Sequence, residues 1–447
     1  MSEAHETPSL GPVGERERIA ALDVLRGAAI FGIFMVNMQF FAMSIVDLVV
    51  PAPPAGGDAA ETACWWVVKV LFEYKFVSIF SLLFGMGMVV QRRRAAARGR
   101  PFTPLYLRRT FVLMGIGLAH ALLLWYGDIL FVYSVASLLV LPLLRLRPKI
   151  LVILAASGFG LSLGIVGCFG AIDVITGSTF QPPVAIEVMP DESGEPGEPD
   201  ETDGVDRWTR FTDALGRVTT GDRKDDLSAW REVEVMAYKD GPMAATLIVR
   251  AGTFVIVLAY ITLGGFGFRV VGMFLLGAAL MKLDFFDARR RRWHLLMCAV
   301  GLPLGVAVDA LAAGLIATGG PDTAWRLAMA DPVHQVGSVL LCGGYVGAVT
   351  LLVAGGALRP LTRALACVGR TALSNYLLQT VVTTFLMYWW GLGWFGDVTR
   401  MQQIALVAGI FAGQVVLSVL WLRFFTMGPL EWAWRSMTYD GLQPIRR

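Results

Sequence analysis

The chain has 447 residues, of which 55% are hydrophobic and 16% are charged, and its mean hydropathy is +0.61. A soluble domain carries about 25% charged residues, whereas apolar runs of membrane-spanning length, roughly 20 residues, recur along this whole chain. The composition excludes a set of soluble domains and predicts an all-α, polytopic membrane protein. The net charge of +3 is uninformative as a total, no nucleotide-binding motif is present, and we expect no nucleic-acid partner.

The first apolar run begins after Arg18 and shows no small-residue cleavage site. A signal peptide carries such a site after a short apolar region. We therefore predict a cytoplasmic tail over 1–21, followed by an uncleaved first span.

Ten spans are predicted: 22–46, 64–90, 106–126, 128–145, 150–175, 246–281, 293–317, 333–357, 368–390 and 402–425. Loops rich in Lys and Arg alternate with loops that carry almost none, and basic loops face the cytoplasm. The basic loops read QRRRAAARGR, RLRPK, MKLDFFDARRRRW and RPLTRALACVGR, and the others cover 47–63, 118–128, 318–332 and 391–400. Both termini are then cytoplasmic, with helices 1–5 over 22–176 and helices 6–10 over 246–425, in the cytoplasmic membrane.

The predicted span 246–281 is too long for one ordinary crossing, because its helix would measure about 54 Å at 1.5 Å per residue. The stretch 263–269 reads LGGFGFR and interrupts it. We predict one broken helix there, its first half interfacial or re-entrant, since a break is tolerated where it lines a cavity or packs inside protein.

Two further segments lie outside the spans. The insert 177–245 begins with an acidic, Pro- and Gly-rich stretch, which predicts an extracytoplasmic and partly disordered loop; the stretch DLSAWREVEVMAYKDG, which follows, is typical of a helix. The insert is either a solvated linker or a gate. The segment 426–447 carries Trp432, Trp434 and Tyr439, which indicate a cytoplasmic interfacial anchor.

Ionisable residues inside spans are functional candidates, since each costs roughly 2.5–3.5 kcal/mol at the bilayer centre. Asp23 and Arg26 are three residues apart in the first span and can pair on one face. Asn37 is eleven residues past Arg26 and falls on the same face. The stripe is either a structural clasp or a cationic entrance for an anionic ligand.

Glu73 and Lys75 lie in the second predicted span and point to different faces, so each should meet a partner on another helix. They form either buried ion pairs or a site of proton chemistry. His120 in the third span is the only histidine we place deep in the membrane, and Asp128 follows at the outer mouth. Imidazole is a natural general base near pH 7; a hydrogen-bonded core histidine is the alternative.

Asn375 and Gln379 share one face of the ninth predicted span. They either join helices or line the same cytoplasmic cavity as Arg26 and Asn37, and we predict the cavity. The cysteines are spread singly, without a CxxC or CxxH pair, so we expect neither a disulfide framework nor a metal site; they are Cys64, Cys168, Cys298, Cys342 and Cys367.

Five blocks together resemble, in this order, the YeiB-like family of bacterial membrane proteins, the domain of unknown function family 418. They read RIAALDVLRGAAIFGIFMVN, EYKFVSIFSLLFGMG, GLAHALLLWYGDIL, GRTALSNYLLQT and GPLEWAWRSMTY. That family is similar to the multi-span acyltransferases of sugars and polysaccharides. The resemblance implies transfer of an acyl group from a cytoplasmic coenzyme A thioester to an acceptor met outside. Those enzymes use a histidine in or just after their first such helix, where this chain has Asn37.

The first functional hypothesis is a membrane acyltransferase. His120 would be the base, oriented by Glu73 or Asp128; Arg26, with Arg92 or Arg109, would hold donor phosphates. Asp23, Asn37, Lys75, Asn375 and Gln379 complete the expected binding set. No cofactor stays bound, acyl-CoA acts as co-substrate, the acceptor is a small molecule or saccharide, and a homo-oligomer is left open. The alternatives are a transporter or flippase for a small anionic or lipid-linked molecule, and a non-catalytic receptor or assembly partner.

Overall fold

The computed structural model describes residues 19–49, 53, 58–176, 203–220, 223–318, 324–356, 358–439 and 441–446. The regular elements in these ranges are helices, with one isolated antiparallel bridge between Phe425 and Arg446. The predicted all-α, polytopic fold is confirmed. Residues 1–18 of the predicted tail over 1–21 lie outside the described residues.

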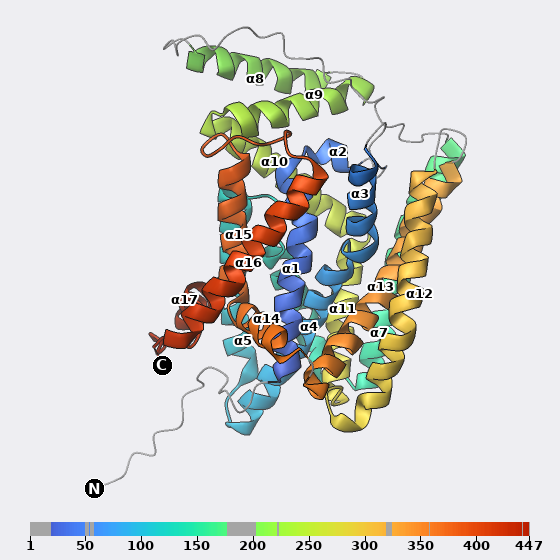
Figure 1. The fold of residues 1–447 in the computed structure, drawn as a ribbon, viewed down its shortest axis with the longest axis vertical. Helices are drawn as coiled ribbons and strands as arrows, with labels where there is room; N and C mark the ends of the chain where they lie inside the picture. The colour runs from blue at the N-terminus through green and yellow to red at the C-terminus, as the bar shows by residue number, and fades with distance from the viewer. Residues whose placement is uncertain are drawn as a thin grey trace.

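The bundle runs lengthwise in Figure 1, with α8 and α9 across one end. The first helices are α1 (Ala20–Ala42), α2 (Ile45–Val49), α3 (Ala59–Leu71), α4 (Lys75–Ala97), α5 (Phe102–Leu123), α6 (Leu130–Val140) and α7 (Pro148–Thr176). Then come α8 (Asp203–Thr220), α9 (Arg223–Val235), α10 (Met243–Leu263), α11 (Phe266–Lys282), α12 (Arg291–Ala317) and α13 (Ala324–Gly355). The last are α14 (Arg359–Arg370), α15 (Ala372–Met387), α16 (Arg400–Phe424) and α17 (Pro429–Thr438).

Six of the described helices are long and apolar enough to cross a membrane alone: α1, α7, α10, α12, α13 and α16. Large apolar side chains on their outward faces are exposed, as at Val255, Leu304 and Leu417. This exposure is typical of lipid-facing helices. The other predicted spans correspond to α3 with α4, α5, α6 and α15.

The predicted break in 246–281 is confirmed: α10 ends at Leu263 and α11 begins at Phe266. The interfacial or re-entrant position of the first half stays a prediction, since α10 alone has the length and composition of a membrane span. Gly265 between them has φ +86°, a left-handed conformation that glycine adopts without strain. The span predicted at 64–90 is also broken, which the sequence analysis did not foresee. Tyr74 separates α3 from α4 with φ +64°, where a side chain is strained.

Glycines let the central helices approach closely. A Cβ on Gly85 of α4 would lie 1.9 Å from the carbonyl oxygen of Phe274 in α11, and one on Gly277 would lie 2.0 Å from that of Leu82. Likewise, a Cβ on Gly369 of α14 would lie 1.9 Å from the carbonyl oxygen of Asp23 in α1. Such contacts bring backbones together as small residues do in membrane bundles, and they place α1, α4 and α11 at the core.

The insert contains more helix than predicted, because α8 already begins at Asp203 within the acidic stretch; residues 177–202 lie outside the described ranges. The helix predicted from DLSAWREVEVMAYKDG corresponds to α9 and the short π-helix Met236–Asp240. Buried Glu234 of α9 accepts hydrogen bonds from the Ser44 hydroxyl and, at 2.9 Å, from the Ile45 amide. These contacts fix α9 to α2 at this end of the bundle.

Candidate active site

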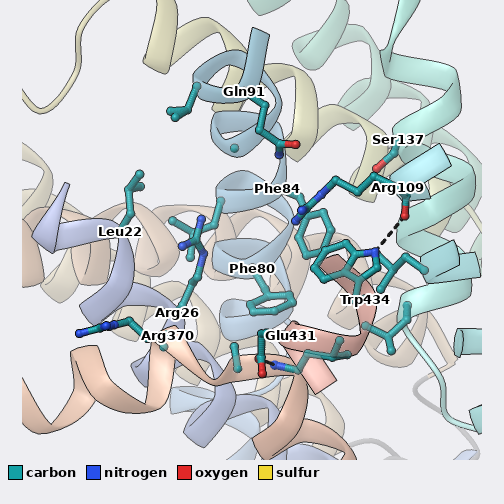
Figure 2. Close-up of a pocket in the computed structure, with 18 of the residues that line it drawn as sticks. Leu22, Arg26, Phe80, Phe84, Gln91, Arg109, Ser137, Arg370, Glu431 and Trp434 are labelled. Atoms are coloured by element: carbon teal, nitrogen blue, oxygen red, sulfur yellow. Dashed lines mark hydrogen bonds between the residues drawn. The ribbon is translucent and has the colours of Figure 1, made fainter. Parts of the chain in front are cut away.

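A cavity of about 240 Å³ opens between α1, α4, α5, α15 and α17. It lies near the end of the bundle opposite α8 and α9, where the predicted cytoplasmic loops lie. Leu22 and Arg26 stand on one side of it and Arg109 with Trp434 on the other, with Phe80 and Phe84 of α4 between them (Figure 2).

Five arginines line this cavity, against two carboxylates, Asp23 and Glu431; the arginines are Arg26, Arg94, Arg109, Arg370 and Arg435. The Arg26 Nη1 lies 3.0 Å from Asp23 Oδ1, so the predicted pairing is confirmed, and the pair stands at the cavity wall. The surplus of guanidinium groups makes the cavity electropositive. Guanidinium groups bind phosphate and carboxylate oxygens through paired, charge-assisted hydrogen bonds.

The C-terminal helix α17 forms part of the wall. The Trp434 indole nitrogen donates to the Arg109 carbonyl at 3.0 Å, and the Arg109 guanidinium lies 3.7 Å from the Trp434 ring centroid (Figure 2). Trp434 is only 9% exposed. Of the three residues predicted as an interfacial anchor, Trp434 and Tyr439 therefore face the cavity, which the sequence analysis missed.

Glu431 fixes α17 to the start of α15. Its carboxylate accepts from the Leu373 amide at 2.6 Å and from the Ser374 hydroxyl at 2.5 Å. A carboxylate at a helix N-terminus is favoured by the unpaired amides and the helix dipole. Burial raises the pKa of Glu431, and the hydrogen bonds from Ser374 and Leu373 oppose that rise.

His120 and Asp128 form a fully buried pair. The His120 Nδ1 lies 2.8 Å from Asp128 Oδ2, and the His120 Nε2 lies 2.9 Å from the Thr380 hydroxyl of α15. The side chains of His120 and Asp128 are 0% exposed. Asp128 is held in turn by the Phe131 amide, which donates to its Oδ1 at 2.7 Å. Two of the three predicted catalytic residues are thus brought together.

The cavity ends beside this pair. Tyr376 of α15 and Ile129, the neighbour of Asp128 in the chain, line its wall. The Tyr376 ring centroid lies 5.2 Å from that of His120. One aromatic ring therefore stands between the arginine-lined cavity and the imidazole.

The prediction that Asn375 and Gln379 line the cavity is wrong. The Asn375 amide donates to Thr371 at 2.8 Å and to Ser418 of α16 at 3.0 Å. Gln379 donates to Gln414 of α16 at 2.9 Å, and Gln414 donates to the Asn375 carbonyl at 2.8 Å. Both side-chain amides face α16 because their partners Ser418 and Gln414 lie on that helix, and the cavity meets other residues of α15.

Asn37 also lies off the cavity. It continues the stripe of Arg26, Ile30 and Ile33 along α1, but the cavity wall includes those three and does not include Asn37. The periodicity of the helix was read correctly. The cavity wall extends along α1 only as far as Ile33, one turn before Asn37, and the sequence does not show this limit.

Glu73 and Lys75 belong to a second buried polar cluster, apart from His120. The Lys75 Nζ lies 3.2 Å from Asp309 Oδ2 of α12, with both side chains 0% exposed. His334 of α13 lies 2.7 Å from Asp309 and 3.9 Å from Glu73. Glu73 also pairs with Lys69 at 3.0 Å. Lys75 does meet another helix, as predicted, but neither residue lies at the cavity.

His120 is not the only deeply buried histidine, since the His334 side chain is 0% exposed within α13. The predicted span 333–357 puts His334 close to its first residue, whereas α13 begins nine residues earlier, at Ala324. Asp309 was missed as well, although a lone carboxylate inside an apolar run is a usable signal. Arg370, Arg435 and Glu431 were missed because no local pattern links α14 or α17 to the cavity.

No cluster of three or more His, Cys, Asp and Glu side chains in the described ranges is arranged to hold a metal ion. The fold and the site define an all-helical, polytopic membrane protein with an arginine-lined cavity beside a buried His–Asp pair.

Comparison with known proteins gives the family. Residues 280–441 match the family model described as Protein of unknown function (DUF418). The chain is 30% identical to uncharacterized protein YxaH of Bacillus subtilis (strain 168), with 98% of each chain covered. It is 27% identical to uncharacterized protein YeiB of Escherichia coli (strain K12), with 96% of this chain and 98% of that protein covered. The chain belongs to the YeiB-like DUF418 family, whose relatives here are bacterial.

Proposed function

We propose that this protein is a membrane-embedded acyltransferase. It takes an acyl group from a coenzyme A thioester and passes it to the hydroxyl or amine of a small-molecule or saccharide acceptor. The observation that carries the proposal is the cavity, which five arginines line and whose wall includes Tyr376, a ring that lies beside the buried His120–Asp128 pair.

The arginines that line the cavity match the charge of the donor. A coenzyme A thioester carries several phosphate charges at one end and its reactive carbon at the other. Arg26, Arg109 and Arg370 would hold the phosphates. The apolar walls formed by Phe80 and Phe84 would take the less polar arm. The donor is a co-substrate that leaves after each turnover.

The buried pair suits the chemistry. An ionised carboxylate can only accept hydrogen bonds, so Asp128 would fix the proton of His120 on Nδ1 and leave Nε2, which faces the Thr380 hydroxyl, as the nitrogen that takes up a proton. His120 would act as general base toward the acceptor. Asp128 would orient the ring and stabilise the imidazolium that forms, as the acid does in other histidine-based sites.

The acceptor would approach from the α8–α9 end, which the distribution of basic loops assigns to the outside of the bacterial cytoplasmic membrane. Two buried groups at this end support a polar approach to His120. Arg250 is 0% exposed and donates to the Leu123 carbonyl, three residues from His120. Its Nε and Nη2, and the Trp125 indole nitrogen, have no hydrogen-bond partner among the described residues.

A transporter or flippase is the second candidate. The buried chain of Lys69, Glu73, His334, Asp309 and Lys75 favours it, because it lies where α3–α4 is broken and beside Pro332 of α13. Charges at broken helices mark ion and substrate sites in transporters. We rank the transporter second because none of these five residues lines the arginine-rich cavity.

The direct test is thiol release by the purified protein in lipid nanodiscs. Acetyl-CoA and longer acyl-CoAs are supplied with glucose or glucosamine as probe acceptors, and coenzyme A binding is measured by calorimetry. The proposal predicts binding and protein-dependent thiol release. Thiol release at the buffer rate with every acyl chain, together with no coenzyme A binding, would overturn it.

A further inference from the structure

Thr380 completes a three-residue relay with His120 and Asp128. Its Oγ1 lies 2.9 Å from His120 Nε2, and the opposite ring nitrogen lies 2.8 Å from Asp128. Thr380 is 1% exposed and His120 is 2% exposed. A hydroxyl, an imidazole and a carboxylate linked in this order are the arrangement by which a neutral hydroxyl becomes a nucleophile.

The hydrogen-bond directions agree with that role. With Nδ1–H donating to Asp128, Nε2 can only accept, so the Thr380 hydroxyl donates to it. The other acceptor near Thr380 Oγ1 is the Tyr376 carbonyl, at 3.5 Å. The shorter contact, at 2.9 Å, is with the imidazole. The hydroxyl proton therefore points to the base that would remove it.

The position of Thr380 suits an acyl group that arrives through the cavity. Tyr376, on the cavity wall, is one helical turn before Thr380 on α15. A donor that displaced the Tyr376 ring would bring its thioester carbon to the Thr380 hydroxyl before it reached any acceptor from the far end of the bundle.

We infer that Thr380 is the nucleophile of a two-step transfer and carries the acyl group as an ester; the inference rests on the proposed function. In the first step the Thr380 Oγ–carbon bond forms and the carbon–sulfur bond of the thioester breaks. His120 takes the hydroxyl proton and passes it to the departing thiolate, which leaves as coenzyme A. In the second step His120 takes the proton of an acceptor hydroxyl or amine, whose oxygen or nitrogen attacks the ester carbon. The bond between that carbon and Thr380 Oγ then breaks, and His120 returns the proton to the Thr380 oxygen.

A two-step transfer has a signature that needs no acceptor. The first step is reversible, so the protein should exchange isotopically labelled coenzyme A into unlabelled acetyl-CoA. Direct transfer within a ternary complex gives no such exchange. The full-length protein in nanodiscs is incubated with both compounds, and the label in acetyl-CoA is followed with time.

Three variants assign the nucleophile. Thr380→Val keeps the shape of the side chain and should reduce exchange at least a hundredfold, whereas Thr380→Ser should retain measurable exchange. Thr384→Val is the matched control, because the Thr384 hydroxyl is equally buried one turn further along α15 and donates to the Thr380 carbonyl at 2.8 Å. It should exchange like the parent.

Each outcome decides the inference. Exchange that is lost in Thr380→Val and kept in Thr384→Val supports it, as does an acetyl adduct on the peptide that contains Thr380. Exchange that persists in Thr380→Val assigns the acyl group to another residue and overturns it. Thiol release and coenzyme A binding without exchange in the parent also overturn it while leaving the proposed acyltransferase intact.

Discussion

The Nδ1 of His120 lies 2.8 Å from Oδ2 of Asp128, and the two side chains are buried together beside Tyr376, which lines the arginine-rich cavity. The turn between α5 and α6 brings them together. A Cβ on Gly117 would lie 2.7 Å from Asp128 Oδ1, so a glycine one turn before His120 leaves room for the carboxylate. The contact between His120 and Asp128 is therefore local: both residues belong to α5 and the turn that follows it.

Asp128→Asn should reduce turnover of acyl-CoA by two or more orders of magnitude, because an amide can donate to Nδ1 and select the wrong tautomer. Loss of an orienting carboxylate in other histidine sites costs about 10⁴ in kcat. The variant keeps the shape of the side chain and should be folded, which near-ultraviolet circular dichroism checks. Parental turnover in a folded Asp128→Asn protein would show that the carboxylate has no role in the reaction.

Arg26→Gln should weaken coenzyme A binding by about tenfold, which corresponds to roughly 1.4 kcal/mol. Folding stability should change little, because an ion pair with a partly exposed arginine contributes about 0–1 kcal/mol; the Arg26 side chain is 34% exposed. Asp23→Asn is the control, since it removes the ion pair and keeps the guanidinium, and it should bind coenzyme A at least as tightly as the parent. Calorimetry measures both. Equal affinity of Arg26→Gln and the parent would remove Arg26 from the donor site.

Lys75→Met should lower the thermal stability of the protein in detergent, because it leaves the buried Asp309 carboxylate without its ammonium partner. Breaking one side of a buried ion pair costs roughly 3–5 kcal/mol. The double variant Lys75→Met with Asp309→Leu should recover most of the loss. Lys69→Met is the control with a smaller expected cost, since its partner Glu73 is 25% exposed. A double variant as unstable as Lys75→Met alone would argue against the ion pair as the source of the effect.

The sequence predicts the parts of this fold that depend on local patterns. The apolar runs give the helical segments, and Gly264 with Gly265 gives the broken helix, because these signals lie within one turn of the feature. The Asp23–Arg26 pair is predicted for the same reason.

Features that depend on which helices become neighbours are not predicted. Asn375 and Gln379 are polar residues in an apolar run, and that pattern is the same for a cavity wall and for a helix contact. Gln414 and Ser418 of α16 decide between the two, and they lie 35 or more residues away in the chain. The partner of Lys75 on α12 and the contribution of α17 to the cavity are not predicted for the same reason: both depend on contacts between helices far apart in the chain.

The docking of α9 on α2 should weaken as pH rises through about 7. Burial raises the pKa of Glu234 from 4.5 to about 7, and its hydrogen bonds with Ser44 and Ile45 only partly oppose the rise. The docked state then binds the proton more tightly than the undocked state. Docking is therefore most stable below the ordinary pKa of the carboxyl and loses stability between that value and about pH 7.

Hydrogen exchange of residues 229–240 measures this effect. After correction for intrinsic rates, protection should be greater at pH 5.5 than at pH 8, and Glu234→Gln should abolish the difference. Glu232→Gln is the matched control, because Glu232 is an exposed neighbour on α9 that pairs with Arg217; it should keep the pH dependence. Equal protection at both pH values in the parent would exclude Glu234 as the titrating group.

The rate of thiol release from acyl-CoA by the His120→Gln protein tests most directly whether His120 is the general base. Glutamine keeps a hydrogen-bonding side chain at this position but cannot take up the proton, and loss of a general base costs about 10²–10⁴ in rate. We expect a folded His120→Gln variant with about a hundredfold slower turnover or more. Glu73→Gln, whose side chain lies in the separate cluster with Lys69 and His334, should stay within a few fold of the parent. Near-parental turnover in His120→Gln, with loss in Glu73→Gln, would contradict this assignment and move the base to the other cluster.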